Sequence, residues 1–336
     1  MAWSHDGSVD LGHTIIDAAA DAGADAINVH VTHLPSYMAA TYGAKNDGKA
    51  TSIETSDVFR YLESINLSFP QIKELVEHAR SRKLEISCLV NDPDSLDFVV
   101  RECAPDLLTI HPSSILEERF VRDAAMAGPA MIIYAGGLRL GELDQVINWA
   151  ASESNERLMI QHGFQSYPTP IEYNRLAYIR TLKRLFGLPV CFADHTDGGD
   201  PMALVVPLLA VAAGADAVEK HITHDRSKKG EDYEAALDPA DFKVFVERLR
   251  LSEAAIGDEE IRKLTDVELR YRSVVRKRAV FVKDLPAGSD LLPEAVMLKR
   301  SDSGLYPEEI APLIGRMKLA RDVRQDEAVG WDMLVR

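Results

Sequence analysis

Cysteine is scarce in this chain of 336 residues. Its three cysteines, Cys88, Cys103 and Cys191, are scattered and form no CxxC pair, which argues against a thiolate zinc site. Cys88 and Cys191 lie within apolar runs, so we interpret them as small core residues of a protein from a reducing compartment. The sequence also has no signal peptide and no apolar run of membrane-spanning length, and we therefore expect a cytoplasmic protein.

Positive charge is the second shortage. The chain has 38 Lys and Arg against 53 Asp and Glu, a formal net charge of −15. Nucleic acids and anionic membranes are bound through basic patches, so this balance argues against both as partners. A small anionic substrate stays possible, because it contacts only the residues of its binding site and not the acidic surface as a whole.

Short apolar runs alternate with amphipathic helical stretches over residues 1–256. Strands that are apolar on both faces and separated by helices are typical of parallel β/α units. We therefore predict an α/β fold, a (β/α)8 TIM barrel, over this range. Met1–Trp3 only begins a first strand, so we expect the chain to start late or to lose part of that strand. The other seven strand candidates are residues 25–31, 84–90, 107–110, 130–135, 158–163, 189–194 and 217–223.

The pattern changes after residue 256. A charged helical stretch over 257–272 indicates a connector. Residues 273–336 contain short β-like runs separated by Pro and Gly turns, which indicates a small β-rich domain. A domain of about 60 residues has little core of its own, so we expect it to dock on a larger surface.

Histidine is placed unevenly along the predicted barrel, and active sites of such barrels lie at the C-terminal ends of the strands. A single histidine there is most simply a hydrogen-bonded wall residue, but the set indicates a titratable mouth suited to a metal or an anion. Eight of the ten histidines fall at or just after a predicted strand end: His5, His30, His33, His111, His162, His195, His221 and His224.

His195 and His221 end the last two predicted strands, which are neighbours in a barrel. Two neutral imidazoles at that separation can share one divalent ion and leave positions open for water and substrate. The alternative is that His195 caps the following helix and His221 only lines the wall. Spacing alone leaves both interpretations open.

Three motifs around these histidines resemble those of the N-acetylneuraminate (sialic acid) synthase family, which includes the spore-coat polysaccharide synthases. They are SYP at 166–168, ADHTDGG at 193–199 and VEKHITHDRSKKGED at 218–232. The segment LKRSDSGLYPEEI at 298–310 is similar to part of that family's C-terminal SAF (antifreeze-like, β-clip) domain. The likeness covers nearly the whole chain in order.

The resemblance implies a metal-dependent, aldol-type condensation of phosphoenolpyruvate with an open-chain amino sugar aldehyde, as in nonulosonate or spore-coat polysaccharide biosynthesis. It implies that His195 and His221 bind the divalent metal, Mn²⁺ with Mg²⁺ or Co²⁺ as alternatives. Tyr167 and Asp232 match residues that lie around the substrates and are the candidate catalytic pair. Arg300 matches an arginine that reaches into the partner's barrel in a domain-swapped homodimer.

The sequence departs from this family where the phosphoenolpyruvate anion binds. Asn28 and Thr109 stand where the family has lysines, so His30 and His111 are the candidate substrate-binding residues in their place. Imidazoles carry charge only when protonated, so anion affinity that depends on them would fall between about pH 6 and pH 8. Three hypotheses follow: a divergent synthase, a metal-dependent aldolase or lyase with another three-carbon partner, and a catalytically silent sugar-binding relative.

Overall fold

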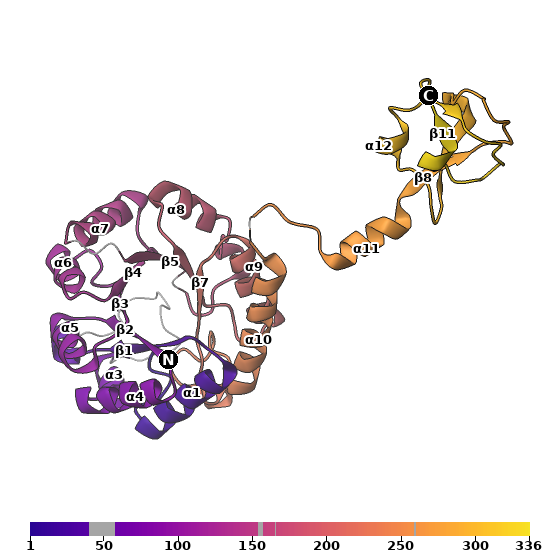
Figure 1. Cartoon of the computed structure of the whole chain (residues 1–336). Coiled ribbons are helices and arrows are strands. Elements are labelled where there is room, and N and C mark those ends of the chain that lie inside the picture. Colours follow the sequence, from indigo (N-terminus) through magenta and orange to yellow (C-terminus); the bar gives the residue numbers. More distant parts are fainter. Residues whose placement is uncertain (40–57, 154–156, 165, 259) are drawn as a thin grey trace. The chain divides into compact units, whose positions relative to one another are not determined.

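The structure is a computed structural model that describes residues 1–39, 58–153, 157–164, 166–258 and 260–336 (Figure 1). The chain divides into two compact units, Met1–Gly257 and Asp258–Arg336. No helix within the described ranges is long and apolar enough to span a membrane.

The first unit is a parallel β/α barrel, which confirms the predicted fold. Its strands form the inner ring in Figure 1 and its helices the outer ring. The strands pair in sequence order, β1 to β7, and every pair is parallel. They are β1 (Ala26–Val31), β2 (Glu85–Val90), β3 (Leu107–Ile110), β4 (Ala130–Tyr134), β5 (Leu158–His162), β6 (Val190–Asp194) and β7 (Ala217–Lys220).

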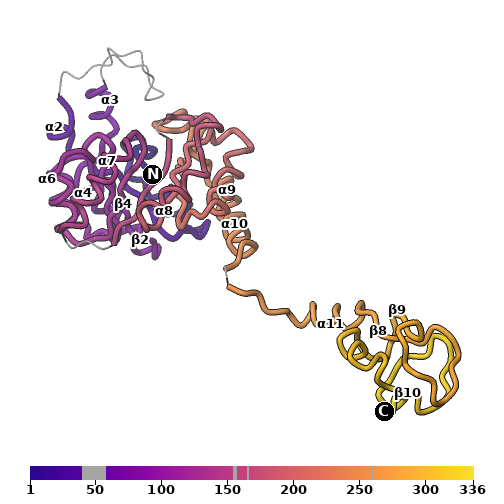
Figure 2. Tube along the Cα trace, turned by 90° about the horizontal axis from the view of Figure 1, so that it is seen from above, coloured from indigo at the N-terminus to yellow at the C-terminus, as the bar shows by residue number. Residues whose placement is uncertain are grey.

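Helices connect these strands and cover the outside of the sheet. Figure 2 shows the same unit turned by 90°, with α9 and α10 next to each other on its flank. The helices are α1 (Val9–Ala22), α2 (Leu34–Tyr37), α3 (Val58–Ile65), α4 (Phe69–Ser81), α5 (Pro93–Phe98), α6 (Glu118–Met126), α7 (Leu140–Ser152), α8 (Tyr178–Phe186), α9 (Val206–Ala212) and α10 (Pro239–Ile256).

The described sheet has seven strands, which agrees with the seven complete strand candidates and with the expected loss of the first strand. Residues 1–7 form turns instead of a strand, with hydrogen bonds from Ser4 N to Met1 O and from Asp6 N to Trp3 O. Backbone groups that are paired within turns cannot pair with a neighbouring strand. The side chain of Ser8 then accepts a hydrogen bond from Leu11 N and starts α1.

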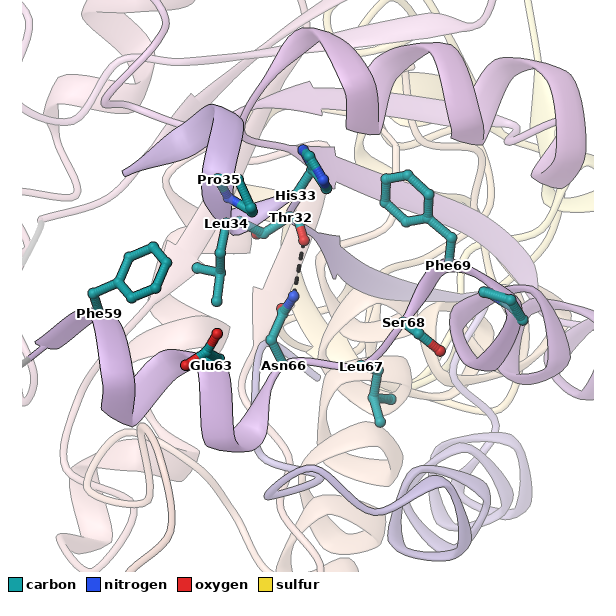
Figure 3. A pocket seen from close by; sticks show the side chains of 11 residues that line it. Thr32, His33, Leu34, Pro35, Phe59, Glu63, Asn66, Leu67, Ser68 and Phe69 are labelled. Carbon is teal, nitrogen blue, oxygen red and sulfur yellow. Dashed lines mark hydrogen bonds between the residues drawn. The ribbon is translucent and has the colours of Figure 1, made fainter. Parts of the chain in front are cut away.

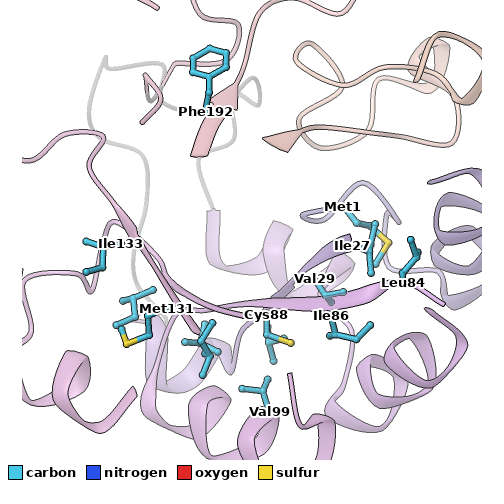
Figure 4. Close-up of a cluster of buried hydrophobic side chains, with 14 of the residues drawn as sticks. Met1, Ile27, Val29, Leu84, Ile86, Cys88, Val99, Met131, Ile133 and Phe192 are labelled. Carbon is cyan, nitrogen blue, oxygen red and sulfur yellow. The ribbon is translucent and has the colours of Figure 1, made fainter. Parts of the chain in front are cut away.

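Alternate side chains of each strand face the helices and form the main core. Ile27, Val29, Ile86 and Cys88 are at most 3% exposed and pack together on the helix side of β1 and β2 (Figure 4). The strand residues between them face the barrel interior, because successive side chains point to opposite faces. This alternation decides which polar residues reach the interior.

A buried ion pair links the last two strands on the helix side. Lys220 Nζ lies 2.8 Å from Asp194 Oδ2, and both side chains are fully shielded from solvent. Asp194 Oδ1 also accepts hydrogen bonds from the backbone and hydroxyl of Thr196, and Lys220 Nζ donates to Thr196 O. The pair therefore fixes the strand ends from which the two candidate metal ligands emerge.

The second unit contains helix α11 (Asp266–Val275) and, after it, the β-rich domain that the sequence predicts. β8 (Lys277–Phe281) and β9 (Val296–Arg300) pair antiparallel, as do β10 (Lys318–Leu319) and β11 (Leu334–Val335). A short helix, α12 (Pro307–Ile310), packs beside β8. Its core is apolar and consists of Ala279, Phe281, Leu291, Leu305, Ile310, Leu319, Val323, Val329 and Leu334.

Candidate functional site

His195 and His221 lie side by side because of the register between β6 and β7. Asp194 pairs with Lys220, and each histidine follows its strand by one residue. Both rings are therefore at the C-terminal edge of the sheet, with centroids 5.1 Å apart. The two residues are 2% and 8% exposed.

The hydrogen bond of His195 fixes its tautomer. Its Nδ1 lies 2.9 Å from the carbonyl oxygen of Phe164. A carbonyl can only accept, so Nδ1 carries the proton and Nε2 keeps its lone pair. Metal-binding histidines are commonly held in this way by a carbonyl or carboxylate on the second nitrogen. His195 thus has the chemistry of a metal ligand.

Tyr167 and Asp232 complete a compact group around the two imidazoles. The Tyr167 ring lies 4.5 Å from the His195 ring and 5.8 Å from the His221 ring, centroid to centroid. Asp232 Oδ2 lies 3.8 Å from Nδ1 of His221, and that nitrogen has no hydrogen-bond partner among the described residues. The structure therefore brings together four of the seven residues predicted for the site.

Burial changes the protonation of this group. It lowers the pKa of His195, and it lowers the pKa of His221 well below its usual value, an effect that the neighbouring His195 increases. Both rings are then neutral at pH 7, as metal binding requires. Burial and the nearby Glu231 carboxylate raise the pKa of Asp232 to about 7. Burial also raises the pKa of Tyr167, so its hydroxyl keeps its proton.

His30 and His111 lie at the C-terminal ends of β1 and β3. His30 is in β1, where its ring meets the edge of Trp3 at 5.8 Å between centroids. His111 follows β3, and its Nδ1 accepts a hydrogen bond from Ser113 N at 3.2 Å. Burial lowers the pKa of His111 to about 4 and that of His30 well below 6.5. Neither ring is an imidazolium between pH 6 and pH 8, so the expected charge-dependent window moves to lower pH.

The remaining predicted residues have separate positions. His162 is in β5 but faces the helices, where its Nε2 lies 2.9 Å from Asn174 O and its ring lies 5.7 Å from that of Tyr178. Strand alternation thus removes it from the mouth. Arg300 is the last residue of β9 in the C-terminal unit and is exposed. Its predicted role in a partner's barrel stays a prediction.

A side-chain contact between β1 and β7 was missed by the sequence reasoning. Asn28 Nδ2 donates to Glu219 Oε2 at 2.8 Å, and no backbone pairing joins β1 to β7 in the described sheet. Glu219 is two residues before His221, so strand alternation could have placed it on the same inner face. The amino group of Met1 also lies here, 3.0 Å from Asn28 O, and burial lowers its pKa.

A second group of possible metal ligands lies at the rim. Ligand atoms of His33, Asp92 and Asp94 lie within 4.8 Å of one another. Asp92, however, accepts hydrogen bonds from His33 N, Ser95 N and Ser95 Oγ, which makes it the N-cap of α5. A hollow of about 430 Å³ adjoins His33, with Asn66 bonded to Thr32 in its wall (Figure 3). The hydrogen bonds already explain this cluster.

The fold and the histidine pair define a parallel β/α-barrel protein with a titratable site at the C-terminal strand ends. The family model named NeuB matches residues 15–261, and the chain belongs to the NeuB family. A second family model, the SAF domain, matches residues 276–335.

Curated relatives extend over nearly the full chain. An N,N'-diacetyllegionaminic acid synthase of Legionella pneumophila is 28% identical and aligns over 98% of this chain and 91% of its own length. The N-acetylneuraminate-9-phosphate synthase of Mus musculus is 25% identical over 98% of this chain and 89% of its own.

Solved structures have the same fold. A spore coat polysaccharide biosynthesis protein E of Chromobacterium violaceum superposes with a TM-score of 0.81 at 20% identity, covering 100% of this chain and 98% of that one. The N-acetylneuraminic acid synthetase of Leptospira borgpetersenii gives 0.69 at 23% identity, covering 82% and 90%.

Proposed function

We propose that this chain is a sialic-acid-synthase-like enzyme. It joins a three-carbon anion, phosphoenolpyruvate or a close relative, to an open-chain amino sugar aldehyde, for nonulosonate or surface polysaccharide biosynthesis. The observation that carries the proposal is the group of His195, His221, Tyr167 and Asp232 at adjacent strand ends of a NeuB-family barrel. The named relatives, which are synthases of such acids, support it. The three cysteines are free thiols, which supports a cytoplasmic setting.

His195 and His221 are the residues proposed to hold a divalent ion, Mn²⁺ with Mg²⁺ or Co²⁺ as alternatives. Their neutral rings, the fixed tautomer of His195 and the unpartnered Nδ1 of His221 fit such an ion. When bound, the ion supplies a Lewis acid that polarises the sugar aldehyde.

Asp232 and Tyr167 are the proposed proton donors. With its pKa at about 7, the Asp232 carboxyl can hold a proton at neutral pH and deliver it to the aldehyde oxygen as the carbon–carbon bond forms. The Tyr167 hydroxyl stays protonated and can orient that oxygen by a hydrogen bond.

Alanine substitutions of the two histidines test this site. Loss of an outer-shell partner typically lowers metal affinity roughly 10- to 100-fold. The double variant His195→Ala/His221→Ala removes both proposed ligands, so its metal affinity should fall by more than that. It should also lose sugar-acid formation, followed by mass spectrometry. His78→Ala, on α4, is the matched control and should keep both. Full metal content in the double variant would remove the basis of the proposal.

The proposed assembly is a domain-swapped homodimer in which Arg300 reaches the partner's barrel. Three apolar side chains on α11 are 61–76% exposed: Val267, Tyr271 and Val274. Their exposure supports an assembly in which this helix is covered. Light scattering of the full chain at micromolar concentration should give a dimer, and Arg300→Ala should lower activity without dissociating it. A monomeric full-length chain contradicts the assembly.

A further inference from the structure

Asp232 has an uncommon backbone conformation. Its φ is +60°, in the left-handed region that few residues other than glycine adopt. Lys229, three residues earlier, has a φ of +54°. Residues in this region keep it only where surrounding contacts hold them, and they cluster at functional sites. The contacts that hold the segment around Asp232 therefore decide where its carboxyl points.

Glu231, the residue directly before Asp232, is 4% exposed and is bonded to two other parts of the chain. Its backbone N–H donates to Asp6 Oδ1 at 3.3 Å, and its carbonyl accepts from Ser4 Oγ at 3.4 Å. Its carboxylate Oε2 accepts from the hydroxyl of Tyr61 at 3.0 Å. The two backbone bonds come from the N-terminal turns, and the side-chain bond comes from α3.

Tyr61 is well placed to hold this carboxylate. Its ring packs against a small buried cluster, Leu34, Leu62 and Ile65, which limits its movement. Burial and the Glu231 carboxylate raise the pKa of Tyr61, so its hydroxyl keeps its proton and acts as the donor. Burial raises the pKa of Glu231 as well, and the hydrogen bond from Tyr61 opposes that change by stabilising the carboxylate form.

The residue after Asp232 is anchored by different contacts. Arg226 Nε donates to the carbonyl of Tyr233 at 3.2 Å, and Arg226 Nη2 donates to Asp197 Oδ1 at 2.9 Å. Asp197 belongs to the loop that follows His195. Asp232 therefore lies between two anchors, one that leads to α3 and one that leads to the loop after β6.

We propose that Tyr61 and Glu231 are a positioning pair that holds the Asp232 carboxyl beside His221. Asp232 Oδ2 lies 3.8 Å from His221 Nδ1. Loss of the Tyr61 hydroxyl removes the side-chain restraint on the residue that directly precedes Asp232, so the backbone can relax out of the left-handed region. The inference rests on the proposed function, in which Asp232 delivers a proton to the aldehyde oxygen.

Tyr61→Phe tests the pair, because it removes the hydroxyl and keeps the ring. The assay is sugar-acid formation from phosphoenolpyruvate and N-acetylmannosamine by the Mn²⁺-loaded full chain. A misplacement of about 1 Å can cost roughly 100-fold in rate, so kcat should fall by about 10- to 100-fold. KM for both substrates should stay within about twofold, because the change acts on the chemical step. Tyr178→Phe, on α8 beside His162, is the matched control and should keep the wild-type kcat.

A double-mutant cycle separates positioning from a general structural role. Asp232→Asn removes the proton that the pair is proposed to place. In that background Tyr61→Phe should lower kcat by no more than about twofold further. An equal loss in both backgrounds overturns the inference, and so does a wild-type kcat in Tyr61→Phe alone. Both of these results leave the proposed function in place.

Crystal structures of the full chain show the placement directly and need no turnover. In the wild-type chain the Asp232 carboxyl should lie beside His221, and in Tyr61→Phe it should turn away, with φ outside the left-handed region. Glu231→Gln keeps an oxygen that can accept from the Tyr61 hydroxyl, so it should preserve the wild-type placement. Glu231→Ala should lose it.

The structures also distinguish failure of this inference from failure of the proposed function. A wild-type chain that forms no sugar acid from these substrates contradicts the proposed function, and the structures then decide the inference by themselves. An Asp232 carboxyl that stays beside His221 in both Tyr61→Phe and Glu231→Ala overturns the inference, whatever the activity of the chain.

Discussion

The barrel unit and the C-terminal unit bury different kinds of side chain. Within the described residues, every buried polar or charged residue belongs to Met1–Gly257, whereas the core of Asp258–Arg336 is apolar. The ten histidines all lie in the barrel unit as well. The larger unit has enough apolar core elsewhere to tolerate a polar interior, whereas the smaller unit does not have such a core in reserve.

Ion pairs differ between the units in the same way. Lys220 and Asp194 are fully shielded from solvent, whereas Lys299 and Asp326 in the C-terminal unit are 40% and 56% exposed. A shielded charge that loses its partner is strongly destabilising, but an exposed one is solvated by water. Replacing the lysine of each pair by methionine therefore tests whether the shielded pair contributes more stability than the exposed pair.

The largest effect is expected for Lys220→Met. It leaves the Asp194 carboxylate shielded and without its cationic partner, so the barrel unit should lose about 3–5 kcal/mol of unfolding free energy. Hydrogen exchange of peptides from β6 and β7, read by mass spectrometry, measures the loss unit by unit. A loss below about 1 kcal/mol would mean that the pair is solvated.

Acid should destabilise the barrel unit more than the C-terminal unit. The His5 pKa is about 4 in the fold and near 6.5 when unfolded, so the unfolded chain binds the proton first as pH falls. Stability from this group is present above pH 6.5 and is lost as pH falls toward 4. Burial lowers the pKa of five other histidines in the same direction: His30, His111, His162, His195 and His221.

Asp232 opposes this trend, because its pKa of about 7 lies above its unfolded value and the folded chain binds that proton first. The histidines outnumber it, so the metal-free barrel should lose about 3 kcal/mol between pH 7.5 and pH 5.5. Unit-resolved hydrogen exchange at the two pH values is the measurement. Equal losses in both units would show that the histidines are not responsible.

Two adjacent glycines in the loop after His195 should respond differently to alanine. A Cβ on Gly198 would lie 2.0 Å from Ala236 O, whereas one on Gly199 would meet nothing closer than Arg226 Nη1 at 3.2 Å. Gly198→Ala should therefore cost about 1–3 kcal/mol and weaken metal binding through the displaced loop. Gly199→Ala is the control, measured by thermal unfolding, and similar costs for both would refute the close approach.

The smallest effect is expected for Lys299→Met in the C-terminal unit. Its exposed pair with Asp326 should contribute less than about 1 kcal/mol. Urea unfolding monitored through Trp331, which is 57% exposed in this unit, is the measurement. A loss as large as that expected for Lys220→Met would remove the distinction between the units.

Much of the barrel could be predicted from sequence because the relevant pattern is local. The candidate at 107–110 coincides with β3 (Leu107–Ile110), and the others begin or end within a few residues of a strand. The candidate at 217–223 is the largest difference, because β7 ends at Lys220. Residues beyond it bond instead to a distant loop, through Leu237 N to His221 O and Thr223 N to Leu237 O. The hydrophobic periodicity of residues 217–223 contains no information on a hydrogen-bond partner so far along the chain.

The candidate site was predictable only in part, for the same reason. His195 and His221 could be paired because each directly follows one of two neighbouring strands. The bond between Asn28 and Glu219 joins residues 191 positions apart, which no local pattern can indicate. The pKa of Asp232 depends on burial and on Glu231, so it too required the three-dimensional arrangement.

The bond between Asn28 and Glu219 also has a consequence for the order of folding. Sheet neighbours from β1 to β7 are successive in the chain, so the sheet can grow by one short loop closure at a time. Contact between its first and last strands requires all of these steps to be complete. His30 and His221 lie on opposite sides of that junction. We therefore expect the complete mouth to form only in the final step, so that partly folded chains expose no working site.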